Sequence, residues 1–348
     1  MIDSYIASPH ECNRHNVSVV GGKAASLGEI VRAGARTPPF FTITSEAYKR
    51  FIKHNNLETK IKDLNSHNEE ETLSKSIALR ASIENGSFPP DLEHNLRRKF
   101  RELISGWSPL AVRSSATLED AKGASFAGQY ESYLGIRTEE ELLHYLRKCY
   151  ASLYTDRAIA YRYKMNLPQD GVYMAVIVQA LVKARSAGVL FTVNPLNGDP
   201  SMVVIESSWG LGEAVVKGEV IPDRFSINKI TREVLEMKNS STKNVVYEAL
   251  DDGSVEKHDA SEKCRELSLS REEAIVLAEY GVKLEKYYGH PQDIEWSIDK
   301  RLNFPDNIFL VQSRPVTLPT TVEKTSSQSR ISDPLERVVS VLLSGVKV

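Results

Sequence analysis

The 348-residue sequence predicts an α+β fold built from two packed subdomains. The length exceeds what one compact core usually holds, so two subdomains are the natural expectation. Helix-like and strand-like segments are mixed without strict alternation, which favours an α+β fold over a doubly wound parallel sheet. The sequence shows no internal repeat, which argues against a solenoid or propeller.

The first half of the chain is mainly helical in pattern. Residues 16–20 suggest a short strand, which leads through two glycines into a helix over 23–33 with Gly34 as its cap. The elements expected next are an extended segment over 40–43, a helix from 44 to about 54, a polar surface helix over 65–85 with apolar Leu73, Ile77 and Ile83, a helix over 91–104, a strand at 110–112 and one long helix over 139–164.

The second half is mainly β in pattern. The longest apolar run, residues 172–182, is about half of what a membrane-spanning helix needs, so it is interpreted as a buried strand. A helix over 271–288 is announced by the capping box of Ser270 and Glu273. Strands are expected at 188–193, 202–207, 224–228, 234–238, 293–298 and 308–312, and a Thr/Ser-rich linker at 319–332.

Composition narrows the functional class. Lys and Arg number 44 against 46 Asp and Glu, a net charge of -2 that argues against a general nucleic-acid binder. The three cysteines are far apart and form no CxxC pair, which argues against a disulfide framework or a zinc site. The N-terminal residues lack the pattern of a signal peptide. We therefore expect a cytoplasmic protein that binds neither nucleic acid nor a membrane.

Two segments of the first half have the composition of phosphate-binding loops. Gly21-Gly22-Lys23 offers a close backbone approach, a helix N-terminus and a positive charge, although the P-loop spacing is absent. Arg113, at the end of a predicted strand, can bind phosphate oxygens with two parallel hydrogen bonds. The small residues of 123–128 suit a lid over a polyphosphate. The alternatives are an ordinary glycine turn and a surface hairpin with an exposed arginine.

Two segments of the second half carry oxygen ligands. Glu295 and Gln312 lie on strands expected to be neighbours, and Arg314 faces the same side as Gln312 because strand residues alternate. Magnesium prefers hard oxygen ligands and often takes few from the protein. The run from Glu206 to Glu213 is compatible with a glycine turn and one carboxylate that faces a ribose or a metal, and it lacks a dinucleotide fingerprint. The alternative for each acid is plain solvent exposure.

Taken together, these segments resemble the nucleotide-binding domain shared by phosphoenolpyruvate synthase, pyruvate phosphate dikinase and rifampin phosphotransferase. The matching segments occur in the family order over residues 19–318 or so. They are VGGKAASLGEI, AVRSSATLEDAKGASFAGQYESYLGI, MAVIVQALV, AGVLFTVNP, ESSWGLGEAVVKGEVIPDRF, YYGHPQDIEWSID and FLVQSRPVT.

The resemblance implies an ATP-grasp-type fold of two subdomains with an ATP cleft between them. Residues 1–185 would form the N-terminal subdomain with its phosphate-binding lid, and residues 186–318 the C-terminal subdomain with the magnesium-binding strands. Residues 319–348 would be a linker and the first strand of a phosphohistidine domain. Two departures stand out: Phe40 replaces the glycine of the usual PPGF stretch, and 300–307 looks longer than is common. An insertion at a hairpin tip is tolerated.

The resemblance also implies roles for residues of the first subdomain. Lys23 and Arg113 would contact the phosphates of ATP. Gly128 and Ser132 would belong to the lid, with Ser132 in a place often held by threonine. Gln179 would face the adenine.

In the second subdomain, the resemblance implies that Glu295 and Gln312 hold Mg²⁺ and that Arg314 binds the terminal phosphates. The catalytic residues would be Lys23, Arg113 and Arg314. They would act by positioning the nucleotide and neutralising its charge.

Enzymes of this family transfer the β,γ-pyrophosphoryl group of ATP to a histidine of a separate swivelling domain and release AMP. Phosphate is then lost, and the remaining phosphoryl group passes to pyruvate or another acceptor. The resemblance therefore implies Mg-ATP as ligand and a phosphohistidine domain, in cis or as a separate chain, as partner. Residues 339–348 resemble the strand that opens that domain, so we expect an engineered fragment or the product of a split gene.

Pyruvate, water dikinase (phosphoenolpyruvate synthase) is the leading hypothesis for the activity. The alternatives are the ATP-binding domain of a rifampin-type antibiotic phosphotransferase, a non-catalytic ATP-binding partner subunit, and an ATP-grasp ligase that releases ADP through an acyl phosphate. Pyruvate or another acceptor would bind a domain outside this sequence.

Overall fold

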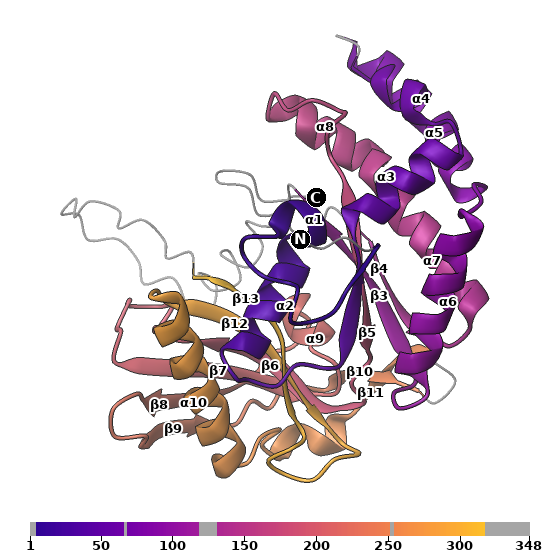
Figure 1. Cartoon of the computed structure of the whole chain (residues 1–348). Coiled ribbons are helices and arrows are strands. Elements are labelled where there is room, and N and C mark those ends of the chain that lie inside the picture. Colours follow the sequence, from indigo (N-terminus) through magenta and orange to yellow (C-terminus); the bar gives the residue numbers. More distant parts are fainter. Residues whose placement is uncertain (1–4, 66–67, 118–130, 251–253, 317–348) are drawn as a thin grey trace, which may run out of the picture. The chain divides into compact units, whose positions relative to one another are not determined.

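A computed structural model describes residues 5–65, 68–117, 131–250 and 254–316 (Figure 1). These residues form two compact units. Unit 1 comprises residues up to 32 and 38–181, and unit 2 comprises 33–37, 182–250 and 255–316. Both units combine helices with antiparallel sheets, which confirms the predicted α+β class.

Unit 1 is built on a five-stranded antiparallel sheet in the order β1-β2-β5-β3-β4. Alternate residues of the central strands enter the large apolar core of the unit, and the residues between them face the other side. The strands are β1 (Ile6–Ala7), β2 (Phe40–Ile43), β3 (Leu110–Ala116), β4 (Ser132–Ile136) and β5 (Met174–Ala180).

Helices cover both sides of this sheet (Figure 1). The core side is packed by α3 (Ser45–His54), α5 (Glu69–Glu84), α6 (Pro90–Ile104), α7 (Glu139–Ala151) and α8 (Asp156–Lys164), with the short α4 (Glu58–Lys62) beside α5. On the other side, α1 (Val17–Val20) leads directly into α2 (Gly22–Arg32), which contacts β3.

Unit 2 is built on a six-stranded antiparallel sheet in the order β13-β12-β6-β7-β8-β9. The strands are β6 (Ala184–Phe191), β7 (Met202–Trp209), β8 (Asp223–Asn228), β9 (Val234–Lys238), β12 (Gln292–Asp299) and β13 (Ile308–Pro315). A separate hairpin pairs β10 (Val245–Ala249) with β11 (Val255–Asp259), and α9 (Glu213–Val216) contacts β10 and β7.

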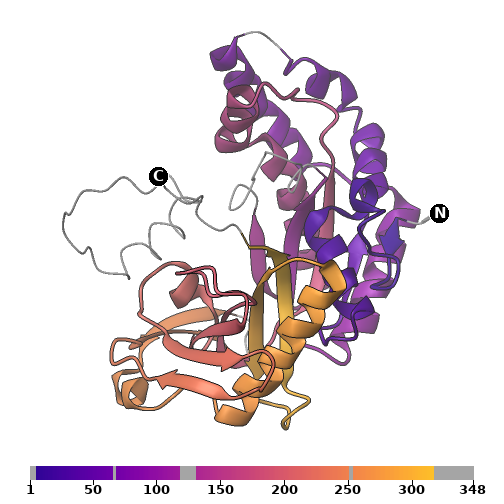
Figure 2. The same ribbon diagram turned by 90° about the vertical axis from the view of Figure 1, so that its left-hand side faces the viewer.

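One long helix, α10 (Arg271–Tyr288), covers one face of the six-stranded sheet (orange in Figure 2). Its Gly281 approaches the sheet so closely that an added Cβ would lie 2.6 Å from Leu190 Cδ2. Leu190 stands in one row with Ile205 and Ile294, and all three are fully buried. The residues of the alternate rows therefore face away from α10. Two of these rows carry carboxylates.

A buried ion pair fastens the loops of unit 2 to the sheet. Asp223 on β8 and Lys243 are both fully buried, and their charged atoms are 2.8 Å apart. The second oxygen of Asp223 accepts hydrogen bonds from the backbone N–H and the hydroxyl of Ser268. Lys243 also donates to the carbonyl oxygens of Ser240 and Cys264. All charged groups of the pair are thus satisfied, as burial requires.

Several predicted elements have different boundaries. Residues 17–20 form a helical turn and not the expected strand, and the predicted long helix 139–164 is broken by a 3₁₀ turn over Ser152–Tyr154. Thr155 then caps α8 with its hydroxyl, which accepts from the N–H of Ala158. The hairpin β10–β11 and the short α9 were not anticipated. On α5, Ile83 and Leu79 are buried, whereas the apolar Ile77 is 60% exposed.

The other main elements agree with the sequence patterns. The helices expected over 23–33, 44–54, 91–104 and 271–288 and the strands expected at 40–43, 202–207, 224–228 and 234–238 lie within one or two residues of their predicted bounds. Among the described helices, none combines the length and the apolar character needed to cross a membrane. The segment 319–348 lies outside the described residues.

Candidate functional site

The N-terminus of α2 is held against β3 by a tight backbone contact. Gly21 has φ 77° and ψ 166°, a conformation that is essentially restricted to glycine. A Cβ at this position would lie 2.0 Å from the carbonyl oxygen of Ser115. The hydroxyl of Ser115 accepts from the N–H of Ala24 at 3.1 Å and donates to the carbonyl of Val20 at 3.0 Å. The glycine is therefore required by this contact as well as by the turn.

This contact places Lys23 beside the strand that carries Arg113. Lys23 lies in the first turn of α2, is half-buried, and donates from Nζ to the carbonyl oxygen of Ser114 at 3.3 Å. Arg113 is the preceding residue on β3 and is also half-buried. Two positive charges and a helix N-terminus thus meet at one place, a combination suited to an anion.

Arg113, Ser132 and Gln179 share one face of the five-stranded sheet. Ser132 on β4 is directly opposite Arg113, and Gln179 on β5 is opposite Ala111, two residues away on the same face. Arg113 donates from Nη1 to Oε1 of Gln179 at 3.2 Å. Gln179 is only 2% exposed, so it is a fixed acceptor that orients the guanidinium. This anchoring contradicts the alternative of an exposed hairpin arginine.

In unit 2, Glu295 and Gln312 are direct cross-strand partners on β12 and β13. Both are half-buried, and directly opposite residues of an antiparallel pair present their side chains on the same face. The prediction that these residues lie on neighbouring strands is confirmed. A register shift between Glu295 and Trp296 locally bends β12 at this point.

Arg314 is engaged with a carboxylate that the sequence reasoning did not single out. It lies opposite Asp293, and its Nε donates to Asp293 Oδ2 at 2.8 Å. The Arg314 side chain is 48% exposed, whereas that of Asp293 is 11% exposed. The other oxygen, Asp293 Oδ1, is buried and has no hydrogen-bond partner in the part of the chain that the structure describes. Asp293 precedes Glu295 by two residues, so strand alternation alone could have identified it.

A third carboxylate, Glu206 on β7, faces the same side of the sheet. It is opposite Val189, which is in turn opposite Glu295, and it is 7% exposed. Burial raises the pKa of Glu206, and the nearby Asp293 raises it further, against the effect of Arg224 on β8. Of the two carboxylates in its motif, Glu206 fits a ligand-facing role better than Glu213.

Glu213, the other carboxylate of that motif, forms an ion pair with Lys217 one turn further along α9.

The carboxylates of this sheet face repel each other. Burial raises the pKa of Asp293 above its ordinary value, Arg314 lowers it, and Glu295 raises it again. A cation placed on this face would relieve the repulsion and satisfy Asp293 Oδ1. Carboxylate and amide oxygens are the donors that Mg²⁺ prefers, and Mg²⁺ often takes only one or two carboxylates from the protein. The residues present therefore fit a magnesium ion, although no tight group of three or more acidic, His or Cys ligands occurs within the described ranges.

The structure brings the predicted site residues together in two groups. Lys23, Arg113, Ser132 and Gln179 converge in unit 1, and Glu295, Gln312 and Arg314 converge in unit 2. Gly128 lies outside the described residues. The functional roles expected for these residues stay predictions.

Comparison with known proteins gives consistent matches. A family model described as pyruvate phosphate dikinase, AMP/ATP-binding domain, matches residues 17–333. The chain is 38% identical to a probable phosphoenolpyruvate synthase of Staphylothermus marinus over 97% of its own length and 44% of that protein. It is also 38% identical to a phosphoenolpyruvate synthase of Aeropyrum pernix, over 97% of this chain and 45% of that protein. The chain thus spans less than half the length of these relatives.

Among solved structures, D-alanyl-alanine synthetase A from Vibrio cholerae aligns with this chain at 11% identity. The alignment covers 84% of this chain and 55% of the synthetase chain. The TM-score of 0.34 is too low to establish a shared fold.

Proposed function

The chain belongs to the pyruvate phosphate dikinase AMP/ATP-binding domain family, and from this premise we propose that it is the ATP-binding part of a phosphoenolpyruvate synthase. It would bind Mg-ATP and transfer the β,γ-pyrophosphoryl group to a histidine of a phosphohistidine domain, with release of AMP. The curated relatives named phosphoenolpyruvate synthase support this branch of the family over the rifampin branch.

The observation that carries the proposal is the convergence of Lys23 and Arg113 at the N-terminus of α2. Lys23 Nζ is bonded to the backbone next to Arg113, and Gln179 fixes the guanidinium. Two positioned cations at a helix N-terminus match the charge of a polyphosphate. We propose that both residues bind phosphate oxygens and that Gln179 holds Arg113 in place. Ser132, opposite Arg113, would contact the same phosphates.

In unit 2, we propose that Glu295 and Gln312 hold the magnesium ion, with Asp293 as a further oxygen donor. Mg²⁺ would neutralise phosphate charge as it develops during transfer. Arg314, whose Nε is bound by Asp293, would contribute a positive charge for the terminal phosphates. Because the chain provides charge and position only, the chemistry requires an acceptor histidine from a phosphohistidine domain.

Nucleotide binding tests the site without the partner. Isothermal titration of the chain with ATP and Mg²⁺ should give saturable binding, and Arg113→Ala should weaken it by about 100-fold, as the loss of a positioned charged donor does. Arg98→Ala is the matched control, because Arg98 is an exposed arginine whose ion-pair partner among the described residues is Glu102 on the same helix. Equal affinities for the two variants would refute the assignment of Arg113.

Group transfer tests the reaction. The chain is mixed with ATP labelled in the β-phosphate and with the part of the Staphylothermus marinus relative that lies beyond its match, which would supply the phosphohistidine domain. The proposal predicts AMP as product and acid-labile label on the added domain. Release of ADP would indicate ligase chemistry, and nucleotide binding without any AMP would indicate a non-catalytic partner subunit. Both outcomes would overturn the proposed transfer.

A further inference from the structure

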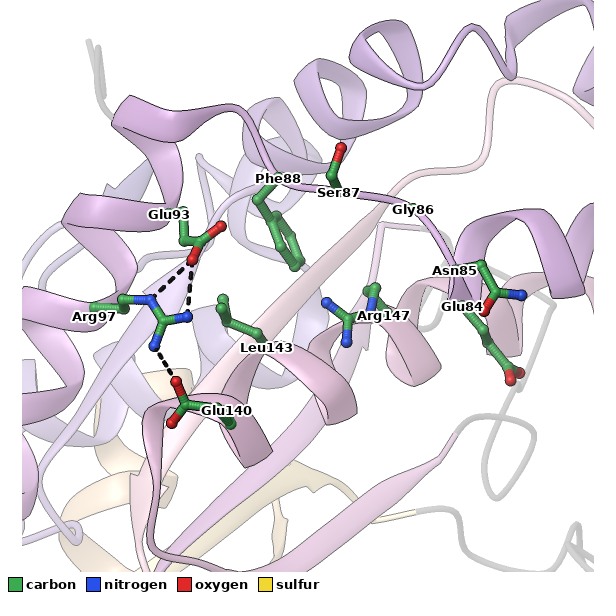
Figure 3. Close-up of a pocket in the computed structure, with 10 residues that line it drawn as sticks. All are labelled: Glu84, Asn85, Gly86, Ser87, Phe88, Glu93, Arg97, Glu140, Leu143 and Arg147. Atoms are coloured by element: carbon green, nitrogen blue, oxygen red, sulfur yellow. Dashed lines mark hydrogen bonds and ion pairs between the residues drawn. The ribbon is translucent and has the colours of Figure 1, made fainter.

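A cavity lies in unit 1, and none of the residues assigned to the nucleotide lines it (Figure 3). Its volume is about 430 Å³, and it is open to solvent. It is bordered by the end of α5, the segment 85–88 and the helices α6 and α7. Phe88 and Leu143, both buried, provide its apolar wall.

The cavity contains two arginines in opposite situations. Arg97 on α6 forms ion pairs with Glu93, Glu139 and Glu140 at 2.8–3.1 Å. Arg147 on α7 forms neither a hydrogen bond nor an ion pair with any residue in the described part of the chain. Figure 3 shows its guanidinium pointing from α7 toward the side where Phe88 and Leu143 lie, with no interaction drawn to it.

The environment of Arg147 makes this lack of a partner costly. Its side chain is half-buried, and its Nε is buried without an acceptor. Burial lowers the pKa of Arg147, against the opposite effect of the nearby Glu93 carboxylate. The aromatic contact found among the described residues is weak, since the guanidinium carbon is 5.9 Å from the centre of the Phe88 ring. The buried Nε has no acceptor, and the terminal nitrogens of the guanidinium are not among the buried atoms, so they are available to an anionic ligand.

The other charges around the cavity restrict the kind of anion. Three glutamates, Glu84, Glu93 and Glu140, line it against two arginines. A polyphosphate would be repelled by these carboxylates, whereas a single negative charge is matched by the one unpaired guanidinium. The planar fork of arginine fits a carboxylate with two parallel hydrogen bonds, and the Phe88 and Leu143 wall fits a short apolar body.

From this geometry we propose that the cavity is a binding site for a small monocarboxylate, with its carboxylate on Arg147 and its hydrocarbon part against Phe88 and Leu143. The site is independent of the nucleotide residues and of the proposed function. Occupancy would stabilise unit 1 by ligand linkage.

Ligand-observed NMR and thermal unfolding of the full chain test the site, with butyrate, norvaline and inorganic phosphate as probes. We expect saturable butyrate binding and a rise in melting temperature that grows with butyrate concentration. Arg147→Gln should weaken butyrate at least 10-fold, and Arg147→Lys should weaken it less. Arg98→Gln, on α6 and outside the cavity, should leave it unchanged.

The unliganded variants separate a ligand site from a structural arginine. If Arg147 awaits a ligand, Arg147→Gln removes a half-buried charge and should raise the melting temperature of the free chain by a few degrees. A fall in melting temperature would show a structural role and overturn the proposal. Butyrate binding that is equal in wild type and Arg147→Gln would also overturn it. Binding of phosphate in preference to butyrate and norvaline, or of none of the three, would refute the monocarboxylate assignment.

Discussion

Replacing Gly21 by alanine tests the contact that positions the N-terminus of α2. The backbone angles of Gly21 lie in a region where other residues cost about 1–3 kcal/mol. The added methyl group would lie 2.0 Å from a backbone carbonyl oxygen of Ser115, which cannot rotate away. Overpacking of this kind costs about 1–3 kcal/mol more. Gly21→Ala should therefore destabilise unit 1 by about 2 to 6 kcal/mol, a large part of a typical folding free energy.

Gly171→Ala is the matched control in the same unit. Gly171 also has a positive φ, +73°, but among the described atoms nothing lies within 4 Å of an added Cβ. This variant should cost only the backbone term, about 1–2 kcal/mol. Urea unfolding gives the two free energies, and hydrogen exchange of the β3 amides locates the change in unit 1. If both variants lose the same stability, the close approach of Gly21 to Ser115 is wrong.

Two further predictions concern charged groups of unit 2. Lys243→Ala should cost about 3–5 kcal/mol because it leaves the buried Asp223 without its counter-charge. Thermal unfolding measures this loss against Lys238→Ala, an exposed lysine on β9, and equal melting temperatures would contradict it. Glu206→Gln should stabilise the ligand-free chain at neutral pH, because burial raises the pKa of Glu206 above its ordinary value of 4.5. Below that value the acid is protonated in both the folded and unfolded states, so the gain should disappear there, and it should be complete above the folded-state pKa. Unfolding measured from about pH 4 to about pH 8 gives this profile. A gain in stability that does not vary with pH would refute the raised pKa of Glu206 as its cause.

The parts of the fold that the sequence predicts well are those with strong local signals. The capping box of Ser270 and Glu273 announces α10, and both of its hydrogen bonds are present in the structure. The neighbouring strands of Glu295 and Gln312 were predicted from two apolar runs separated by a polar turn, and these residues are direct partners. In these cases local preference and tertiary packing agree.

The wrongly predicted elements are those in which short-range sequence preferences compete with tertiary contacts. The valines at 17, 19 and 20 favour a strand, yet the chain forms one helical turn, because the sheet contact at Gly21 fixes what precedes it. The broken helix has a local cause that was overlooked: Thr155 followed by Asp156 is a helix-start signal inside an apolar helical pattern. In the hairpin β10–β11 only Val246 and Ala249 are buried, and every residue of β11 is half-exposed or exposed, so the apolar alternation is weak.

Residue pairs across strands explain what sequence could and could not say about the site. Arg113 was identifiable from its motif, but its bond to Gln179, 66 positions away, follows only from the register of β3 and β5. Glu206 lies two strands away from Glu295, and that proximity depends on the strand order of the whole sheet. Sequence motifs therefore identified the residue types, and sheet topology determined which of them act together.

The pKa values on the sheet face of unit 2 carry a further argument about function. A buried acid with a raised pKa destabilises the ligand-free fold, so a purely structural role gives no physical reason for Glu206 and Asp293 to be where they are. A magnesium ion would convert the same repulsion into binding energy, because its positive charge would balance carboxylates whose negative charge the protein leaves partly unpaired. Removal of Glu206 should then act in opposite directions on two measurements: it raises the melting temperature of the free chain and reduces the increase produced by Mg-ATP. A structural acid would lower the first and leave the second unchanged, so the pair of measurements distinguishes a ligand-facing carboxylate from a structural one.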